Sequence, residues 1–190
     1  MQKQYDSLKL IKVENVGEFV YKVSLNRPSK FNALNMEIWK LVRRTFPGKV
    51  ATKDAILSVK EVDIGMAADV GTLNRLPKVV GNHSWIKDIC LTARHFSAGE
   101  ALQFDLLSRV FDTREEMINE VTKMAKLIAS KSPVGVQGTK NVLNYARENT
   151  IENSLNYVAT WNMSQLFTDD LVKASMASFS KQPQPPFSKL

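Results

Sequence analysis

The order of hydrophobic patterns constrains this chain most, because strand-like segments come first and helical segments follow. Residues 8–13 and 19–25 are rich in β-branched and aromatic side chains and lie on either side of Gly17. This pattern predicts an antiparallel hairpin. A helix is predicted from Asn35 to Phe46, ended by Pro47-Gly48, and a strand is predicted over residues 55–64, ended by Gly65.

Helical spacing dominates after a break near Gly81-Asn82. A short helix or turn is predicted over 70–81, before the break, and longer helices over 115–130, after Ser132-Pro133, over 151–166 with Thr150 as cap, and after Thr168. The 151–166 segment carries apolar residues around much of its circumference. Such a helix is usually covered on several sides, so we expect a neighbouring subunit to cover it.

Composition fits one folded core with a helical appendage, since the 190 residues are 44% hydrophobic and 24% charged. The net charge of +7 admits an anionic partner such as a phosphorylated small molecule. The basic residues are scattered and no zinc spacing occurs, so nucleic-acid binding is not expected. With Cys90 as the sole cysteine and His83 and His95 as the sole histidines, we expect neither an intramolecular disulfide nor a metal site.

The two ends of the sequence suggest a location in the cell. Residues 1–10 lack the apolar run of a signal peptide, and no stretch reaches the roughly 18 apolar residues of a membrane span. The polar, proline-rich segment 181–190 is expected to be extended and ends in Ser188-Lys189-Leu190, the tripeptide read by the peroxisomal import receptor. We therefore expect a peroxisomal protein, with the mitochondrion as the alternative.

Two carboxylates, Glu61 and Asp69, flank a short apolar stretch that contains Gly65. Burial of Glu61 at the end of the predicted strand would raise its pKa, and two carboxylates facing one cleft can remove a proton from one carbon and return it to another. Asp63 is a third candidate. The same residues also admit structural roles, with Asp69 capping the next turn and Glu61 paired with Lys60 or Lys78.

Several segments carry a family resemblance. "LNRPSKFNALN" (25–35) and "RLPKVVGNHSWIKDICLTARHFSAGEAL" (75–102) resemble segments of the crotonase, or enoyl-CoA hydratase/isomerase, superfamily. "VKEVDIGMAADVGTL" (59–73), "SKSPVGVQGTK" (130–140) and "SLNYVATWNMS" (154–164) resemble its Δ(3,5)-Δ(2,4)-dienoyl-CoA isomerase branch. The resemblance implies a truncated crotonase-like α/β fold, with a strand-rich N-terminal part and a helical C-terminal part.

The resemblance also implies roles and partners. Asp69 matches the family's base and Glu61 the group that protonates the far end of the dienolate, in fatty acid β-oxidation. The implied substrate is an acyl-CoA thioester, with coenzyme A as part of the substrate and no separate cofactor. A trimer or hexamer is the implied assembly. We expect residues 1–81 to form a partial crotonase core, 82–180 a helical oligomerisation region and 181–190 an extended tail.

The sequence departs from the family in two places. Only residues 47–53 join the first predicted helix to the next strand, where the family has a long segment with two glycine-rich oxyanion loops. No Ala-Gly-x-Asp or Gly-Gly-Gly motif occurs, so weak or absent turnover is expected. Asp105 stands where the family usually has glycine, and aspartate tolerates a left-handed turn there. The alternatives are a non-catalytic subunit that associates with full-length family members and a basic module for an anionic partner.

Overall fold

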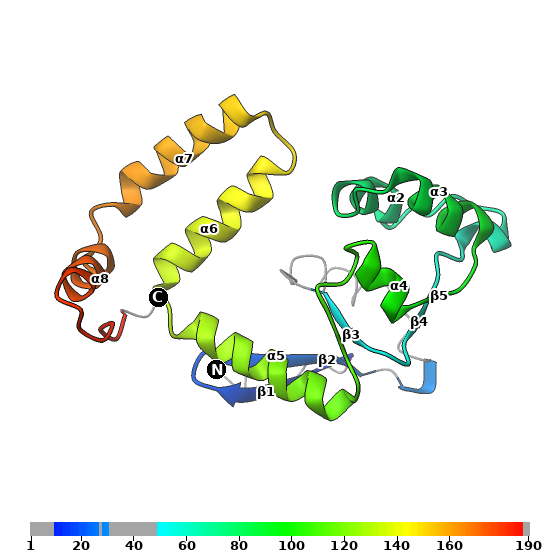
Figure 1. The fold of residues 1–190 in the computed structure, drawn as a ribbon, viewed down its shortest axis with the longest axis horizontal. Coiled ribbons are helices and arrows are strands. Elements are labelled where there is room, and N and C mark those ends of the chain that lie inside the picture. The colour runs from blue at the N-terminus through cyan, green and yellow to red at the C-terminus, as the bar shows by residue number, and fades with distance from the viewer. Residues whose placement is uncertain (1–9, 27, 31–48, 188–190) are drawn as a thin grey trace. The chain divides into compact units, whose positions relative to one another are not determined.

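The computed structural model describes residues 10–26, 28–30 and 49–187 (Figure 1). The chain divides into two compact units: residues 45–121, here called the central unit, and residues 1–44 with 122–190, here called the flanking unit. The helix predicted from Asn35 to Phe46 and the tripeptide 188–190 lie outside the described residues. The division into 1–81, 82–180 and 181–190 stays a prediction.

The N-terminal hairpin is confirmed. Strand β1 (Ile11–Gly17) pairs antiparallel with β2 (Val20–Leu25), and Ile11 lies opposite Leu25. The first strand is longer than predicted because Gly17 still pairs with Val20, after a register shift next to Asn15. Asn15 closes the turn by accepting a 3.0 Å hydrogen bond from the Gly17 N–H at Oδ1.

The central unit holds two short sheets and several short helices. Strand β3 (Val50–Thr52) pairs parallel with β6 (Arg109–Phe111), and β4 (Ile56–Leu57) pairs antiparallel with β5 (Phe96–Ser97). The helices are the 3₁₀ turns η3 (Glu61–Ile64) and η4 (Leu76–Lys78) and the α-helices α2 (Thr72–Arg75), α3 (His83–Thr92) and α4 (Ala98–Gln103). A third 3₁₀ turn, η2 (Pro28–Lys30), follows the hairpin. The turn predicted over 70–81 is therefore present as α2 and η4.

The strand predicted over 55–64 is wrong beyond Leu57, where β4 ends. The chain curls into η3 because the Asp63 and Gly65 N–H groups donate to the carbonyls of Lys60 and Val62, at 3.0 and 3.1 Å. Gly65 ends the turn with φ of 78°, in the left-handed region that glycine adopts without a Cβ clash. Glu61 therefore begins a 3₁₀ turn and does not end a strand.

The core of the central unit gathers around α3. Trp85 is 5% exposed, and its ring stacks on Phe104 at 4.8 Å and meets Phe96 edge-on at 5.3 Å. Ile89 and Val80 are the largest fully buried side chains of the described part of the chain. The other buried members of this core are Leu76, Ile86, Cys90, Ala98, Ala101 and Leu107.

Four longer helices follow, and α5 (Arg114–Ala129) spans the division between the units. In the flanking unit, α6 (Pro133–Ala146) packs against α7 (Ile151–Gln165), and α8 (Asp169–Phe179) follows. The predicted caps are confirmed for two of them, since the side chains of Ser132 and Thr150 accept hydrogen bonds from backbone N–H groups of α6 and α7. Thr168 is the N-cap residue of α8, but its side chain makes no capping bond.

Asp105 has the left-handed conformation expected for it, with φ of 60°. It follows α4, where the Asp105 and Leu106 N–H groups bond the carbonyls of Leu102 and Ala101 at 3.1 and 2.9 Å, the pattern of a Schellman motif. We expect Asp105→Gly to raise the free energy of unfolding slightly and Asp105→Ala to lower it by about 1 kcal/mol, because alanine lacks aspartate's tolerance of positive φ. Urea unfolding of the two variants measures this difference. Equal midpoints would contradict it.

Candidate active site

The segment that carries the predicted catalytic carboxylates is anchored to the end of α3. The Ser58 hydroxyl and the Lys60 ammonium both donate to the Ala93 carbonyl oxygen, at 2.9 and 2.7 Å. Ala93 ends α3 with φ of 49° and is 1% exposed. A cation is favourable at this point because helix carbonyls give the C-terminus a partial negative charge. Glu61 follows the anchor directly in the chain.

Glu61 lies half-buried beside α3. Burial, and then the negative charge of Glu61, raise the pKa of the Cys90 thiol on that helix. The alternative pairing of Glu61 with Lys60 is not found, because the Lys60 ammonium contacts Asp63 Oδ2 at 3.0 Å. That ion pair is exposed, which makes Asp63 a surface partner of Lys60 and weakens its case as a catalytic acid.

Asp69 is exposed at a turn, directly after the buried Ala68. The alternative role of Asp69 as a cap of the following turn is not found, and the N-cap residue of α2 is Gly71, with φ of 91° and no side-chain capping bond. Among the described residues, no ion pair or hydrogen bond engages the Asp69 or Glu61 carboxylate or joins one to the other. Both are thus available to a ligand, one half-buried and one in solvent.

Apolar side chains between and after the two carboxylates are exposed within the central unit. Ile64 is 76% exposed, and Val62, Met66, Val70 and Leu73 are each 40 to 44% exposed. Isolated surface hydrophobics need no explanation, but a run of them in one short segment indicates a binding or contact surface. The carboxylates therefore sit in an apolar segment that the described part of the central unit leaves uncovered.

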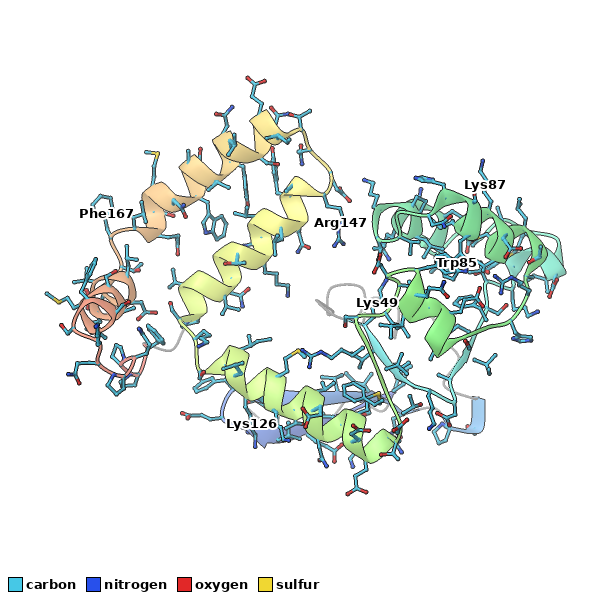
Figure 2. All side chains as sticks on the ribbon, in the orientation of Figure 1. Lys49, Trp85, Lys87, Lys126, Arg147 and Phe167 are labelled. Carbon is cyan, nitrogen blue, oxygen red and sulfur yellow. The ribbon has the colours of Figure 1, made fainter. Side chains whose placement is uncertain are left out.

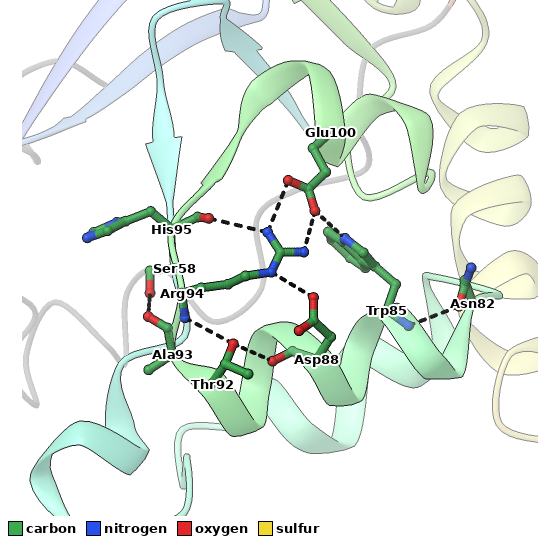
Figure 3. A network of polar contacts seen from close by, with 9 residues as sticks. All are labelled: Ser58, Asn82, Trp85, Asp88, Thr92, Ala93, Arg94, His95 and Glu100. Carbon is green, nitrogen blue, oxygen red and sulfur yellow. Dashed lines mark hydrogen bonds and ion pairs between the residues drawn. The ribbon is translucent and has the colours of Figure 1, made fainter.

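A polar network that the sequence analysis missed joins α3 to α4 (Figure 3). Arg94 donates from Nε to Asp88 Oδ2 at 2.6 Å and from both terminal nitrogens to the Glu100 carboxylate at 3.1 and 2.5 Å. Trp85 Nε1 donates to Glu100 Oε1 at 2.7 Å. The network links the helix that anchors the Glu61 segment to the next helix, so it positions the site.

This network predicts a pH dependence of stability. The Arg94 guanidinium, and then the Trp85 indole, lower the pKa of Glu100 below its ordinary value of 4.5. Because the folded-state pKa is the lower one, the stabilisation is complete above pH 4.5 and is lost as pH falls through the folded-state pKa. We expect the Glu100→Gln variant to be less stable at pH 7 and to lose less stability on acidification. Parallel pH profiles for both proteins, measured by thermal unfolding, would contradict this role.

Within the described residues, no group of three histidine, cysteine, aspartate or glutamate side chains could hold a metal ion. No helix among those residues combines the length and apolarity needed to cross a membrane.

Comparison with known proteins identifies the family. The family model for enoyl-CoA hydratase/isomerase matches residues 49–189. The chain belongs to the enoyl-CoA hydratase/isomerase family. The matched range contains Glu61, Asp69 and the Arg94 network, and it begins after the predicted signature at 25–35.

Several relatives of this chain carry the name dienoyl-CoA isomerase. The mitochondrial Δ(3,5)-Δ(2,4)-dienoyl-CoA isomerase of Rattus norvegicus is 50% identical over 134 residues, covering 70% of this chain and 41% of the relative. The peroxisomal enzyme of Arabidopsis thaliana is 46% identical over 142 residues, covering 75% of this chain and 50% of the relative. This chain thus spans half or less of the length of these curated relatives.

Solved structures show the fold. The crystal structure of enoyl-CoA hydratase from Bacillus anthracis has a TM-score of 0.83 at 16% identity, covering 94% of this chain and 98% of that chain. The chain therefore has the crotonase-like α/β fold of the enoyl-CoA hydratase/isomerase family, as the sequence resemblance predicted.

Proposed function

We propose that this chain carries the acid–base segment of a Δ(3,5)-Δ(2,4)-dienoyl-CoA isomerase that acts in fatty acid β-oxidation. The observation that supports this most is the presence of two carboxylates without an ion-pair partner in the described chain, Glu61 and Asp69, in an exposed apolar segment. The names of the relatives from rat and Arabidopsis agree with it. The proposed substrate is an acyl-CoA thioester, so coenzyme A belongs to the substrate and no separate cofactor is needed.

The proposed reaction moves one proton along the acyl chain. Asp69, which is exposed, takes the proton from the carbon next to the thioester. Glu61, half-buried beside α3, gives its own proton to the far end of the dienolate, and proton exchange with water then restores both carboxyl groups. The apolar side chains between them would contact the acyl chain.

We propose that turnover by this chain is weak. Removing the proton next to a thioester places negative charge on the carbonyl oxygen, and losing one oxyanion donor typically costs about 10²- to 10³-fold in rate. The glycine-rich motifs that would supply those donors do not occur in the sequence. The acid and base residues would therefore act on an oxyanion that lacks its usual stabilisation.

The test is an ultraviolet assay of the purified chain with a 3,5-dienoyl-CoA, beside the rat isomerase. We expect a rate at least about 10²-fold below that of the rat enzyme, and its loss in Asp69→Asn. Asp63→Asn is the matched control, because Asp63 lies in the same segment but pairs with Lys60. A rate equal to the rat enzyme's would refute the weak turnover, and a rate unchanged in Asp69→Asn would refute the assigned base.

A second candidate function is that of a non-catalytic subunit that associates with full-length family members. The observation that favours it is the apolar surface of α7 and α8 and the loop between them, where Phe167 stands out from the helices (Figure 2). The most exposed apolar side chains there are Ile151 at 81%, Met163 at 73%, Phe167 at 89% and Phe179 at 90%. Surfaces of this kind mark subunit contacts.

Co-expression with a tagged full-length isomerase tests this second function. If the helices form the interface, the chain co-purifies with the tagged partner, and Leu155→Glu on the exposed face of α7 removes it. Co-purification that Leu155→Glu leaves intact would place the contact elsewhere. If the two proteins are recovered separately, the second function is refuted and the catalytic proposal remains.

We also propose peroxisomal localisation through Ser188-Lys189-Leu190, read by the import receptor. The peroxisomal relative in Arabidopsis supports this, whereas the mitochondrial relative in rat supports the alternative. Microscopy of the chain tagged at its N-terminus, with and without Leu190, separates the two locations.

A further inference from the structure

The segment after α8 turns back on itself. Lys181 adopts a left-handed conformation with φ of 52°. The Lys181 and Gln182 N–H groups bond the carbonyls of Ser178 and Ala177 at 3.1 and 2.8 Å, which is a Schellman motif. Three prolines follow, at 183, 185 and 186, and they restrict the backbone. The direction of the tail is therefore set by a specific turn and a stiff segment.

Phe187, the last described residue of the tail, lines a groove of the flanking unit. The groove has a volume of about 480 Å³ and lies among α6, α7 and α8, with the half-buried Phe187 among the residues that line it. The apolar walls come from all three helices and include Val142, Val158, Leu166 and Leu171. Residues 182, 183, 184 and 186 are exposed and Pro185 is half-buried, and Phe187 is the tail residue that lines the groove.

We propose that this groove is the docking site of the chain's own C-terminal segment, residues 182–187, held by Phe187. Because Phe187 immediately precedes the terminal tripeptide, a receptor that encloses the end of the chain competes with the groove for this segment. The competition between receptor and groove rests on the proposed targeting role of residues 188–190. The prolines favour docking because a restricted backbone has less conformational entropy to lose when it binds.

Docking through one half-buried ring is reversible. One aromatic side chain of the tail lines the groove, and residues 182, 183, 184 and 186 are exposed. Transient release exposes both the groove and the tail, as expected of a weakly held terminal segment. The groove then accepts the same segment supplied as a separate peptide.

The first experiment measures binding of a fluorescent peptide of residues 181–190 to the full chain by anisotropy. We expect the Phe187→Ala chain, whose own tail has lost the ring that lines the groove, to bind the peptide at least about 10-fold more tightly than the unmodified chain. The same peptide carrying Phe187→Ala is the control and should not bind. Equal, weak binding by both chains, with circular dichroism showing both folded, would overturn the docking site.

The second experiment separates competition from targeting. Leu166→Asp places a charge in the groove at a 53% exposed position and leaves the tail sequence intact. If groove and receptor compete, this variant binds the receptor's tripeptide-binding domain several-fold more tightly than the unmodified chain. Unchanged affinity would overturn the competition. Failure of the receptor to bind the free peptide would instead refute the targeting proposal, while the peptide–groove measurement stands.

Discussion

Replacing Trp85 by alanine is expected to lower the stability of the central unit by about 3–5 kcal/mol, the usual cost of removing a buried aromatic side chain. The ring is 5% exposed and contacts both Phe96 and Phe104. Its indole N–H also donates to Glu100, so the truncation removes a hydrogen bond to a charged group. Hydrogen exchange of the α3 amides measures the change where it occurs.

One variant separates the packing of Trp85 from its hydrogen bond, and a second is an exposed control on the same helix. Trp85→Phe keeps most of the ring and loses the bond to Glu100, so we expect a clearly smaller loss than in Trp85→Ala. Leu91→Ala, on the same helix but 72% exposed, should change stability little. If Trp85→Ala matched Leu91→Ala, the core described around α3 would be refuted.

Gly138→Ala is expected to lower the stability of the α6–α7 pair by about 1–3 kcal/mol, as overpacking of a core does. A Cβ atom at this buried glycine would lie 2.8 Å from Trp161 Nε1, a contact that real Cβ atoms essentially never make. Relief requires either that the Trp161 ring turns away from α6, with a change in its contact with Tyr157, or that the helices separate. Thermal unfolding followed by tryptophan fluorescence measures the loss.

Gly135→Ala is the matched control, one turn earlier on α6. Its added Cβ would meet Ser132 Cβ at 3.9 Å, an ordinary contact. Because alanine favours a helix over glycine by up to about 1 kcal/mol, this variant should be more stable than the unmodified chain. Opposite signs for the two substitutions are the expected result, and the same sign would contradict the close helix packing at Gly138.

Local patterns were sufficient for much of the fold. The hairpin follows from alternating side chains around Gly17, and the starts of α6 and α7 follow from Ser132 and Thr150, because caps act on backbone groups two or three residues away. The left-handed Asp105 was expected because it stands where the family usually has glycine, and aspartate tolerates that conformation. In each case the deciding interactions lie within a few residues.

The strand predicted over 55–64 was wrong beyond Leu57 because the β-branched residues Val62 and Ile64 have a high strand propensity but do not pack in a sheet. Both side chains are exposed, so no packing against a neighbouring strand stabilises an extended conformation. The Lys60 ammonium donates both to Asp63 Oδ2 and to the Ala93 carbonyl oxygen, and these bonds favour the turn instead. The second of these partners lies 33 residues away and could not be inferred from local pattern.

The assignment of Glu61 and Asp69 as catalytic residues stays a prediction from the sequence. The structure places both in one apolar segment. The Arg94 network was missed because its members come from two helices and a loop. One local signal was available: Ser97 and Glu100 have capping-box spacing, and Ser97 does accept a bond from the Glu100 N–H. The Glu100 carboxylate, however, accepts hydrogen bonds from Arg94.

The Ala93 carbonyl has a consequence for the order of folding. Its two donors, Ser58 and Lys60, reach it across 35 and 33 residues, so the contact forms only after α3 has ended in its left-handed turn. Closing a loop of that length costs entropy before it yields any contact. The segment bearing Glu61 is therefore expected to be acquired late, after the helix, and to be the first part of the central unit released during unfolding.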